Sequence, residues 1–350
     1  MYRLISFIIF LSITWSGFAQ IGGDHTYQFL TLTPSAKIAS LGGNQVVDWG
    51  NNLDFADQNP AMLNDQMSGH FSLNFVGYYA GIKFGNVAYA HTFKKYGTFA
   101  LNIKSINYGD FLYADVNGDT FGTFGASETS YGIAWSYPID SVLHFGVNLK
   151  GITSQLESYY SNGAAVDFGV IYHKKSKQLT AGVVFKNVGS QFRTYYTEAE
   201  NEPLPFEIEL AISKRLAHAP FRIHVGFQHL EQLDLSYEDP ANPSETENPL
   251  TGEIEKESKF KNYSETFLKH FIVGAEFLPT ENFYISVAYN AQRRAEMKID
   301  THKGLVGFSW GFGLNVSKFR FGYAQTRYHL AGPSHHFSFG TNLSQFYSKA

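Results

Sequence analysis

The sequence predicts an all-β protein, a transmembrane antiparallel β-barrel of about 14 strands that follows a short irregular amino-terminal segment. Three observations predict this fold. Apolar and polar residues alternate along many stretches of strand length, short and long connections follow one another in turn, and the composition is aromatic although its mean hydropathy is low. Alternation alone also fits a soluble barrel, whereas a soluble sandwich has no reason to separate its short and long connections in this way, so the connections carry the stronger signal.

Alternation is clearest in the stretch Phe221-Arg-Ile-His-Val-Gly-Phe-Gln228. Because successive side chains of a strand point to opposite faces, its apolar residues share one face and its polar residues the other. A soluble barrel would turn the apolar face inward, so alternation alone leaves the buried face undecided.

The composition excludes several classes of protein. The 350 residues include 32 Phe, 22 Tyr and 32 Gly, with 17% aromatic residues and a mean hydropathy of -0.20. A membrane barrel gives this pairing because its lipid-facing and lumen-facing residues cancel in any average. There is no Cys, which excludes disulfides and thiolate chemistry. A net charge of -4, with no basic patch among aromatics, argues against nucleic acid as a partner.

Residues 1–19 are typical of a secretory signal peptide, with a basic Arg3, an apolar run from Leu4 to Trp15 and small residues before Gln20. The run is shorter than the ~20 residues of a spanning helix. We therefore expect residues 20–67 to form a periplasmic or plug segment and residues 68–350 to form the barrel, in the outer membrane of a Gram-negative bacterium. Within the first segment, residues 35–41 predict a short helix that ends at two glycines, and Asn59-Pro60 predicts a turn.

The connections between the predicted strands differ in length. Even-to-odd connections are tight and most odd-to-even connections are long, above all 108–125, 188–204, 231–267 and 291–303. Outer-membrane barrels have short periplasmic turns and longer external loops, so we expect the long loops outside. The strands are predicted at 69–78, 80–92, 96–107, 126–138, 141–154, 161–173, 177–187, 205–216, 220–230, 268–278, 281–290, 304–316, 317–327 and 334–344. The stretch from Phe337 to Phe346 resembles a closing strand that ends in an aromatic residue.

Charged residues decide which face meets lipid. A Lys or Arg on the lipid side at the bilayer midplane costs roughly 2–4 kcal/mol. The apolar faces are therefore expected to meet lipid and the charged faces to line the lumen, within a sheet that closes on itself because open edges are not tolerated in hydrocarbon. The predicted lumen residues are Lys104, Lys150, Glu207, Glu209, Arg222, His224, Glu276 and Arg320.

Loop 231–267 is the one charge-dense region, with ten acidic residues against three lysines. A solvated loop is the simpler interpretation, and a docking surface for an external partner is the alternative. The partner-binding candidates are Asp234, Glu238, Asp239, Glu245 and Glu247.

Two motifs resemble those of enzymes, but neither has the required context. Gly307-Phe-Ser-Trp-Gly311 matches the nucleophile elbow of hydrolases, yet it lies in a strand pattern with no helix after it. Ser258-Lys-Phe-Lys261 matches S-x-x-K but lacks the companion motifs of penicillin-binding enzymes. We therefore expect no catalytic residue and no cofactor.

Two further patterns bear on metal binding. Asp115, Asn117 and Asp119 alternate as the oxygen ligands of a calcium loop do, although an Asn-Gly turn is the simpler interpretation. His335 and His336 are adjacent on a strand, point to opposite faces and cannot chelate one metal together. His144 and His224 are expected to join Glu207, Glu209 and Glu276 in a polar network inside the barrel.

Three short motifs carry a family resemblance: Tyr27-Gln-Phe-Leu-Thr-Leu32, Ser35-Ala-Lys-Ile-Ala-Ser-Leu-Gly-Gly43 and Asn59-Pro-Ala61. They resemble the barrel components of the type IX secretion system, and more distantly the FadL-like channels for hydrophobic compounds. Beyond these motifs the likeness lies in strand number, loop lengths and overall size. The resemblance implies a FadL-like barrel that acts without catalysis.

The same resemblance implies a set of partners. The barrel would hold a surface protein similar to PorZ beside the sortase PorU and the barrel PorV, in the attachment complex that processes cargo and links it to lipopolysaccharide. Two hypotheses follow for the function. The first is a docking barrel that works through its loops, and the second is a channel for hydrophobic molecules that works through its lumen.

Overall fold

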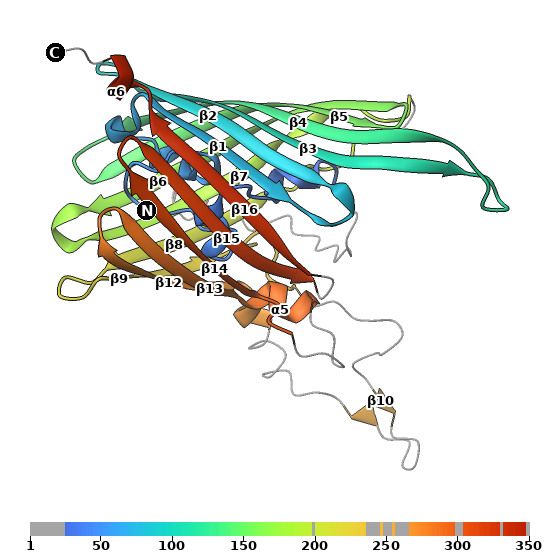
Figure 1. Ribbon diagram of the computed structural model, residues 1–350. Coiled ribbons are helices and arrows are strands. Elements are labelled where there is room, and N and C mark those ends of the chain that lie inside the picture. Colours follow the sequence, from blue (N-terminus) through green and yellow to red (C-terminus); the bar gives the residue numbers. More distant parts are fainter. Residues whose placement is uncertain are drawn as a thin grey trace, which may run out of the picture.

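A computed structural model of the 350-residue chain describes residues 25–197, 200–235, 246–247, 254–255, 266–297, 304–329 and 332–347. The expected signal peptide, residues 1–19, lies outside this range, and so does the S-x-x-K motif at 258–261. In the described residues one closed antiparallel sheet surrounds a lumen that contains the segment before the first strand (Figure 1).

Fourteen strands close the barrel in the order β1-β16-β15-β14-β13-β12-β9-β8-β7-β6-β5-β4-β3-β2, which confirms the predicted fold class and strand number. A separate two-stranded sheet pairs β10 (Thr246–Glu247) with β11 (Ile254–Glu255). The barrel strands are β1 (His70–Gly77), β2 (Lys83–Phe93), β3 (Gly97–Ala114), β4 (Thr120–Pro138), β5 (Leu143–Leu156), β6 (Tyr159–Lys174), β7 (Leu179–Arg193), β8 (Glu207–Arg215), β9 (Phe221–Phe227), β12 (Phe271–Thr280), β13 (Phe283–Asn290), β14 (Phe308–Val316), β15 (Phe319–His329) and β16 (Gly332–Asn342).

The barrel closes between its first and last strands. β1 pairs with β16 over its whole length, from His70 opposite Asn342 to Gly77 opposite His335. The predicted closing role of the carboxyl-terminal stretch is therefore confirmed. Phe346, however, lies beyond the strand in α6 (Ser344–Tyr347), because the sheet pairing ends at Asn342.

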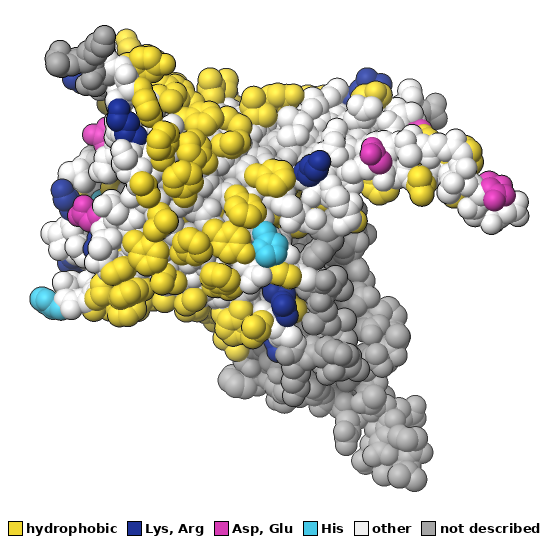
Figure 2. Space-filling view, in the orientation of Figure 1, with side chains coloured by type: hydrophobic (Ala, Val, Ile, Leu, Met, Phe, Trp, Pro, Cys, Tyr) yellow, Lys and Arg dark blue, Asp and Glu magenta, His cyan; other side chains and the backbone are white. Residues whose placement is uncertain are grey.

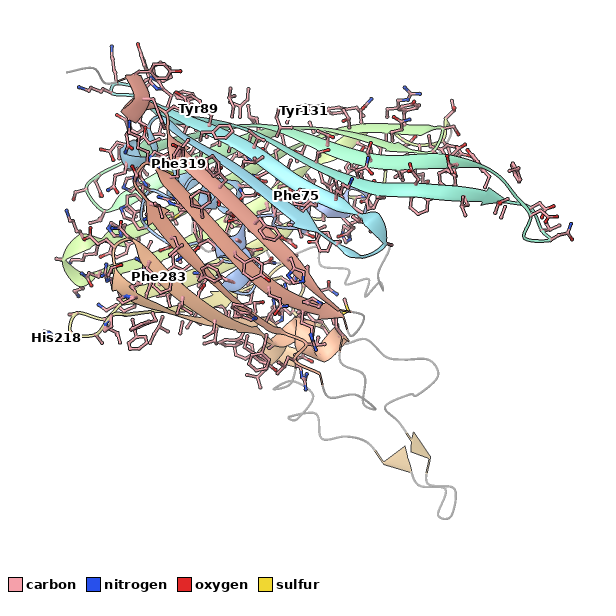
Figure 3. The ribbon with its side chains drawn as sticks, in the orientation of Figure 1. Phe75, Tyr89, Tyr131, His218, Phe283 and Phe319 are labelled. Carbon is pink, nitrogen blue, oxygen red and sulfur yellow. The ribbon has the colours of Figure 1, made fainter. Side chains whose placement is uncertain are left out.

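Burial along the strands confirms which face points outward. In β3 the apolar Leu101 and Ile103 are exposed, whereas the intervening Asn102 and Lys104 are buried. Apolar side chains gather over the outside of the barrel wall, and the labelled Phe75, Tyr89 and Tyr131 lie on this outer surface (Figures 2 and 3). Exposed apolar side chains around a closed sheet fit a protein whose wall faces lipid.

The strands are joined by short connections at one end of the barrel and by long ones at the other, as predicted. Several regions that were predicted as long loops are partly strand, however. At one end the strands join through tight connections such as 281–282 and 317–318. At the other end β3 and β4 extend to Ala114 and Thr120, so most of the predicted loop 108–125 is a hairpin. The predicted loop 188–204 likewise begins with the last part of β7. The predicted strands stop where the alternation of apolar and polar residues stops, at the end of the barrel wall. Backbone pairing between the two strands continues beyond that point.

Helical structure is confined to short elements. Helix α5 (Ala291–Met297) follows strand β13 directly, within a region predicted as a loop. No helix among the described residues is long and apolar enough to cross a membrane. Other short helices are η1 (Gln28–Thr31), α2 (Ala36–Ser40), α3 (Phe55–Gln58), η2 (Pro60–Met62), η3 (Asp65–Met67), η4 (Tyr79–Gly81) and η5 (Lys175–Lys177), and one helical turn covers residues 266–269.

Candidate functional site: the filled lumen and the protruding hairpin

Residues 25–69, which we call the interior segment, lie inside the barrel. Its helix α2 packs against β13 to β16, while η2 packs against β4 to β6 on another part of the wall. Its apolar side chains supply much of the buried core, including Phe29, Ile38 and Phe55. The interior segment therefore bridges the lumen rather than lying along one side.

The predicted helix at residues 35–41 is present as α2, and it ends at the glycine pair as expected. The N–H groups of Gly42 and Gly43 donate to the carbonyls of Ala39 and Ile38. Gly42 has a φ of 99°, where a side chain is strained, and a Cβ there would also overlap Ile272 of β12. Asn290 and Arg293 donate to the Gly42 carbonyl at 3.2 and 3.1 Å. The helix end is thus fastened to the barrel wall.

The Asn59-Pro60-Ala61 motif is the second anchor of the interior segment. Asn59 caps η2 by accepting a hydrogen bond from the Ala61 N–H at 3.0 Å, and its amide approaches the Val183 carbonyl at 3.4 Å. Facing glycines make room for the motif: a Cβ on Gly146 would overlap the Pro60–Ala61 backbone, and one on Gly169 would overlap the Asn59 side chain. The motif fits only against a wall that lacks side chains at these two positions.

A buried charge centre joins the interior segment to β9 and β12. Lys37 of α2 pairs with Glu276, and Arg222 pairs with Asp48 of the interior segment. Two longer contacts cross-link the pairs, Arg222 to Glu276 at 3.3 Å and Lys37 to Asp48 at 3.8 Å. Glu276 is 0% exposed. Buried charges of this kind are tolerated only when they are paired.

His224 extends the charge centre as a neutral ring. Its Nε2 lies 2.8 Å from a Glu276 oxygen, and its Nδ1 lies 2.9 Å from the amide nitrogen of Gln45. Since an amide nitrogen can only donate, Nδ1 accepts and Nε2–H donates to Glu276. The two partners fix the tautomer of the ring and hold residue 45 of the interior segment against β9.

Further charge contacts lie at other places around the lumen. Lys104 of β3 pairs with Asp57 at 2.6 Å. Lys186 of β7 pairs with Glu209 at 2.9 Å and donates to Gln58 at 2.9 Å. The interior segment is therefore held by charge contacts on two separate regions of the wall.

The sequence prediction of a polar network inside the barrel is confirmed in part. His224 and Glu276 contact each other as expected. His144 does not join the carboxylates; it lies against the Trp49 ring, with the ring centres 4.5 Å apart. Sequence reasoning also missed Lys37, Asp48 and Asp57, which supply the interior half of the ion pairs. The available signal was Lys37, which is the one Lys or Arg between residues 25 and 69.

The β3–β4 hairpin forms a second feature, outside the lumen. Beyond Asn107 and before Ala126 the two strands pair with each other after their partners β2 and β5 have ended. The hairpin therefore protrudes from the barrel (Figure 1). Exposed apolar side chains cover it, and rings stack across the pair: Phe111 on Phe124 at 5.2 Å and Tyr113 on Phe121 at 5.7 Å between centres.

The calcium-like pattern lies at the tip of this hairpin and forms a turn. The Asp115 carboxylate accepts hydrogen bonds from the N–H groups of Asn117 and Asp119, both at 2.9 Å, and these lower the pKa of Asp115. Gly118, with φ 89°, completes the turn. The carboxylate thus has backbone partners, as the Asn-Gly turn interpretation predicts. The described residues include no cluster of three or more His, Cys, Asp or Glu that could hold a metal.

The other singled-out residues lie in the barrel wall. Ser309 is buried within β14, opposite Thr326 of β15, so its motif forms no strand-to-helix elbow. His336 is fully buried, whereas its neighbour His335 contacts the Tyr323 hydroxyl at 2.8 Å.

The acidic candidates of loop 231–267 are only partly described. Asp234 lies within the described residues, and Glu247 lies in β10, without a description of its side chain. Glu238, Asp239 and Glu245 lie outside the described residues. Their role in partner binding stays a prediction.

The long-loop end of β8 and β9 carries one titratable cluster. His229 lies 3.0 Å from Glu231 and 3.9 Å from Glu207, and Glu231 also accepts from the Ile208 N–H at 2.7 Å. Burial opposes a charge on the ring, but the Glu231 hydrogen bond and the Glu207 charge outweigh it and raise the pKa of His229 to about 9. The protonated ring therefore ties β9 to β8 at neutral pH.

The closed sheet, its apolar outer face and its charged interior define a membrane β-barrel of the outer-membrane type. Among solved structures the chain is similar to the Pseudomonas putida toluene transporter TodX, at a TM-score of 0.50 and 10% identity over 88% of this chain and 96% of that one. It is also similar to the ΔS2S3 mutant of TodX, described as a monoaromatic hydrocarbon channel, at a TM-score of 0.51 and 10% identity over 89% of this chain and 99% of that one.

A Pseudomonas aeruginosa FadL homologue also matches, at a TM-score of 0.46 and 9% identity over 89% of this chain and 98% of that one. No protein-family model and no curated protein matches the sequence. At 10% identity the TodX structures bear on the fold alone. They are a transporter and a channel rather than enzymes, and their barrel agrees with the FadL-like fold that the sequence predicted.

Proposed function

We propose that this protein is a non-enzymatic scaffold of the outer membrane, a barrel like PorQ of the type IX secretion system, that anchors a surface partner. The observation that carries the proposal is the lumen itself. Its own interior segment crosses it and is fastened by buried ion pairs to β3, β9 and β12. A barrel filled in this way works as a rigid support.

The interior offers little to a hydrophobic substrate. Sites for such molecules are lined mostly by apolar and aromatic side chains. The wall of this lumen instead presents buried charges, among them Lys150 paired with Asp167 at 2.7 Å and Lys186 paired with Glu209 at 2.9 Å. To open a passage, the segment would have to break several pairs, and each broken pair leaves a buried charge that costs about 3–5 kcal/mol.

The β3–β4 hairpin provides a surface suited to a partner. Leu112 and Phe121 are 65% and 69% exposed there, a pattern that marks binding surfaces when apolar residues gather. Residues 111–114 and 120–124 pair only with each other among the strands described, so each keeps an outer edge to which a partner strand can add.

The resemblance of the interior motifs to type IX barrels supplies the finer assignment. On that basis the partner is a surface protein similar to PorZ, held beside PorU and PorV. The long-loop end, with the hairpin, is proposed to face the cell exterior. The acidic loop with Asp234 and Glu247 is a second proposed contact surface.

Shortening the hairpin tests the scaffold. A variant in which residues 110–124 are replaced by a two-residue turn keeps every pairing of β3 with β2 and of β4 with β5. Pull-down from detergent-solubilised outer membrane is expected to recover PorZ-like, PorU-like and PorV-like partners with the full chain and to lose the surface partner with the shortened one.

The matched control is a chain in which the acidic residues of loop 231–267 are neutralised while the hairpin is kept. Loss of the surface partner in this control alone would move the contact from the hairpin to the acidic loop. Full recovery of the partners with both surfaces altered would contradict the scaffold.

A channel for hydrophobic compounds is the second candidate, and the fold comparisons favour it more than they favour the secretion role. The support is that both TodX structures are described as a hydrocarbon channel or transporter. For this chain, transport would require the interior segment to move away from β9 and β12.

Uptake measurements distinguish the two candidates. Cells that lack the protein should take up labelled toluene and labelled long-chain fatty acid as well as wild-type cells if it is a scaffold. A clear loss of uptake, restored by the full chain and by the hairpin-shortened chain alike, would establish the channel instead.

A further inference from the structure

The short-turn end of the barrel contains a cavity of about 210 Å³. It lies between residues 51–54 of the interior segment and the ends of β1, β13, β14, β15 and β16. Phe283 and Phe319, labelled in Figure 3, mark the ends of β13 and β15 beside it. Of the charge centre only Lys37 lines it, whereas Glu276, Arg222 and Asp48 do not.

Two cations that line this cavity have only uncharged hydrogen-bond partners among the described residues. Arg320 contacts the side-chain oxygen of Asn51 at 2.6 Å, the Asn51 carbonyl at 3.3 Å and the Asn315 side-chain oxygen at 3.3 Å. Lys318 donates to the Gln345 carbonyl at 2.7 Å and lies 4.5 Å from the centre of the Phe346 ring. A guanidinium has five N–H donors, so about two of those of Arg320 remain after three contacts.

Lys37 and Asp54 also bring charge to this cavity. Lys37 reaches it, but Lys37 is paired with Glu276 and Asp48. The carboxylate of Asp54 also lines the cavity, and it accepts from Ser35 at 2.7 Å and from Asn74 at 2.8 Å. Both of these partners are neutral, and the charge of Asp54 acts on Arg320. One carboxylate therefore faces the two cations Arg320 and Lys318, which leaves the cavity with a net positive charge.

An unused hydroxyl points to the same ligand chemistry. Ser72 of β1 lines the cavity, is 6% exposed, and its Oγ has no hydrogen-bond partner among the described residues. Buried hydroxyls without partners are uncommon, because a buried polar group that makes no hydrogen bond costs free energy. A ligand with acceptor oxygens would satisfy both this hydroxyl and the remaining Arg320 donors.

We propose that this cavity binds a small oxyanion, a phosphate or carboxylate group, through Arg320 and Ser72. The planar fork of an arginine matches both groups, and each offers more than one acceptor oxygen. Asn52, Asn282 and Asn342 line the same cavity and supply neutral donors around the ligand. Free inorganic anions and the head groups of larger molecules share this chemistry.

Binding to the purified full chain in detergent tests the site. Titration calorimetry with inorganic phosphate, with glycerol phosphate and with acetate, at low chloride, is expected to show saturable binding of at least one of them. Arg320→Gln should weaken that binding by about tenfold or more, because it removes a charged donor. Arg215→Gln, at the end of β8 and outside the cavity, should leave it unchanged.

Ser72→Ala provides a second test in case the Arg320→Gln chain fails to fold, because this substitution removes only the unpartnered hydroxyl. It should weaken binding about threefold or more while the barrel stays intact. Preference for glycerol phosphate over free phosphate would assign a head group as the ligand, and the reverse would assign the free anion. The proposal is overturned if none of the three binds saturably, or if Arg320→Gln and Arg215→Gln bind alike.

Discussion

The two halves of β3 lie in different surroundings although they belong to one strand. From Gly97 to about Asn107 its residues alternate between exposed and buried, because one face meets the interior and the other lies outside. Beyond that point the neighbouring strands have ended and both faces are largely exposed. The comparison teaches that the charged lumen and the apolar exterior belong to the closed wall, whereas the protruding hairpin places aromatic residues in the open.

The largest expected effect comes from the charge centre inside the wall. Glu276→Gln leaves Lys37 and Arg222 with Asp48 as their only carboxylate partner in the part of the chain that the structure describes. We expect a loss of about 3–5 kcal/mol in the free energy of unfolding, the cost of uncompensated buried charge. Urea unfolding in detergent, followed by tryptophan fluorescence, measures it. The control Glu281→Gln, exposed in the β12–β13 turn, should change little; equal effects would remove the special role of the interior.

A pair of substitutions on β3 tests the outer surface directly. Ile103→Lys places a charge on the outside of the wall and should cost roughly 2–4 kcal/mol if that position is near the bilayer midplane. Leu112→Lys, on the protruding part, should cost under about 0.5 kcal/mol, as surface changes usually do. Unfolding from lipid vesicles gives both values. If the two costs are the same, the boundary between wall and protruding hairpin is misplaced.

Glycines on the wall test how closely the interior segment fits. Gly169→Val would overlap Asn59 and should destabilise the protein by about 1–3 kcal/mol, through overpacking and displacement of η2. Gly151→Val, on the outer face of β5 with nothing within 4 Å of its Cβ, is the matched control. Limited proteolysis of the amino-terminal region should accelerate in the first variant alone. Unchanged cleavage there would mean that the interior segment does not depend on this fit.

The smallest effect concerns the rim of the barrel at the long-loop end. The folded-state pKa of His229, about 9, lies above its ordinary 6.5, so its contribution is complete below pH 6.5 and is lost as pH rises through 9. Deprotonation of the ring between pH 6.5 and 10 should lower the free energy of unfolding by roughly 1–2 kcal/mol. The loss is limited to this size because a quarter of the side chain is exposed to solvent, which screens the ion pairs. His229→Gln should flatten the stability profile over that range. A profile that keeps its slope in this variant would assign the dependence to another group.

The sequence predicted the wall well because the wall repeats one local rule. Alternation at residues such as Leu101 and Lys104 reports the two faces without knowledge of any neighbour. The same rule misplaced strand ends, since Phe111 and Phe124 pair by backbone and ring contact after the alternation has stopped. Pairing beyond the wall depends on a partner strand, which no single stretch reveals.

The candidate site was predicted only in its wall half. Arg222, His224 and Glu276 were placed in the lumen because charge is costly on the lipid face. Their partners Lys37 and Asp48 come from residues distant in sequence, and no spacing rule connects them. Arg320 was likewise placed inside, but its cavity is formed by six separated stretches of chain and could not be foreseen.

By itself the sequence determined that this chain forms a barrel of about 14 antiparallel strands, with its apolar face outward and its charges inward, because both follow from side-chain alternation and from the cost of charge in lipid. Only the tertiary structure decided what fills the barrel, which charges meet, and where a strand pair protrudes from the wall. Those outcomes depend on contacts between residues far apart in the chain, such as Lys37 with Glu276 and Asn59 against Gly169, and local pattern carries no information about them.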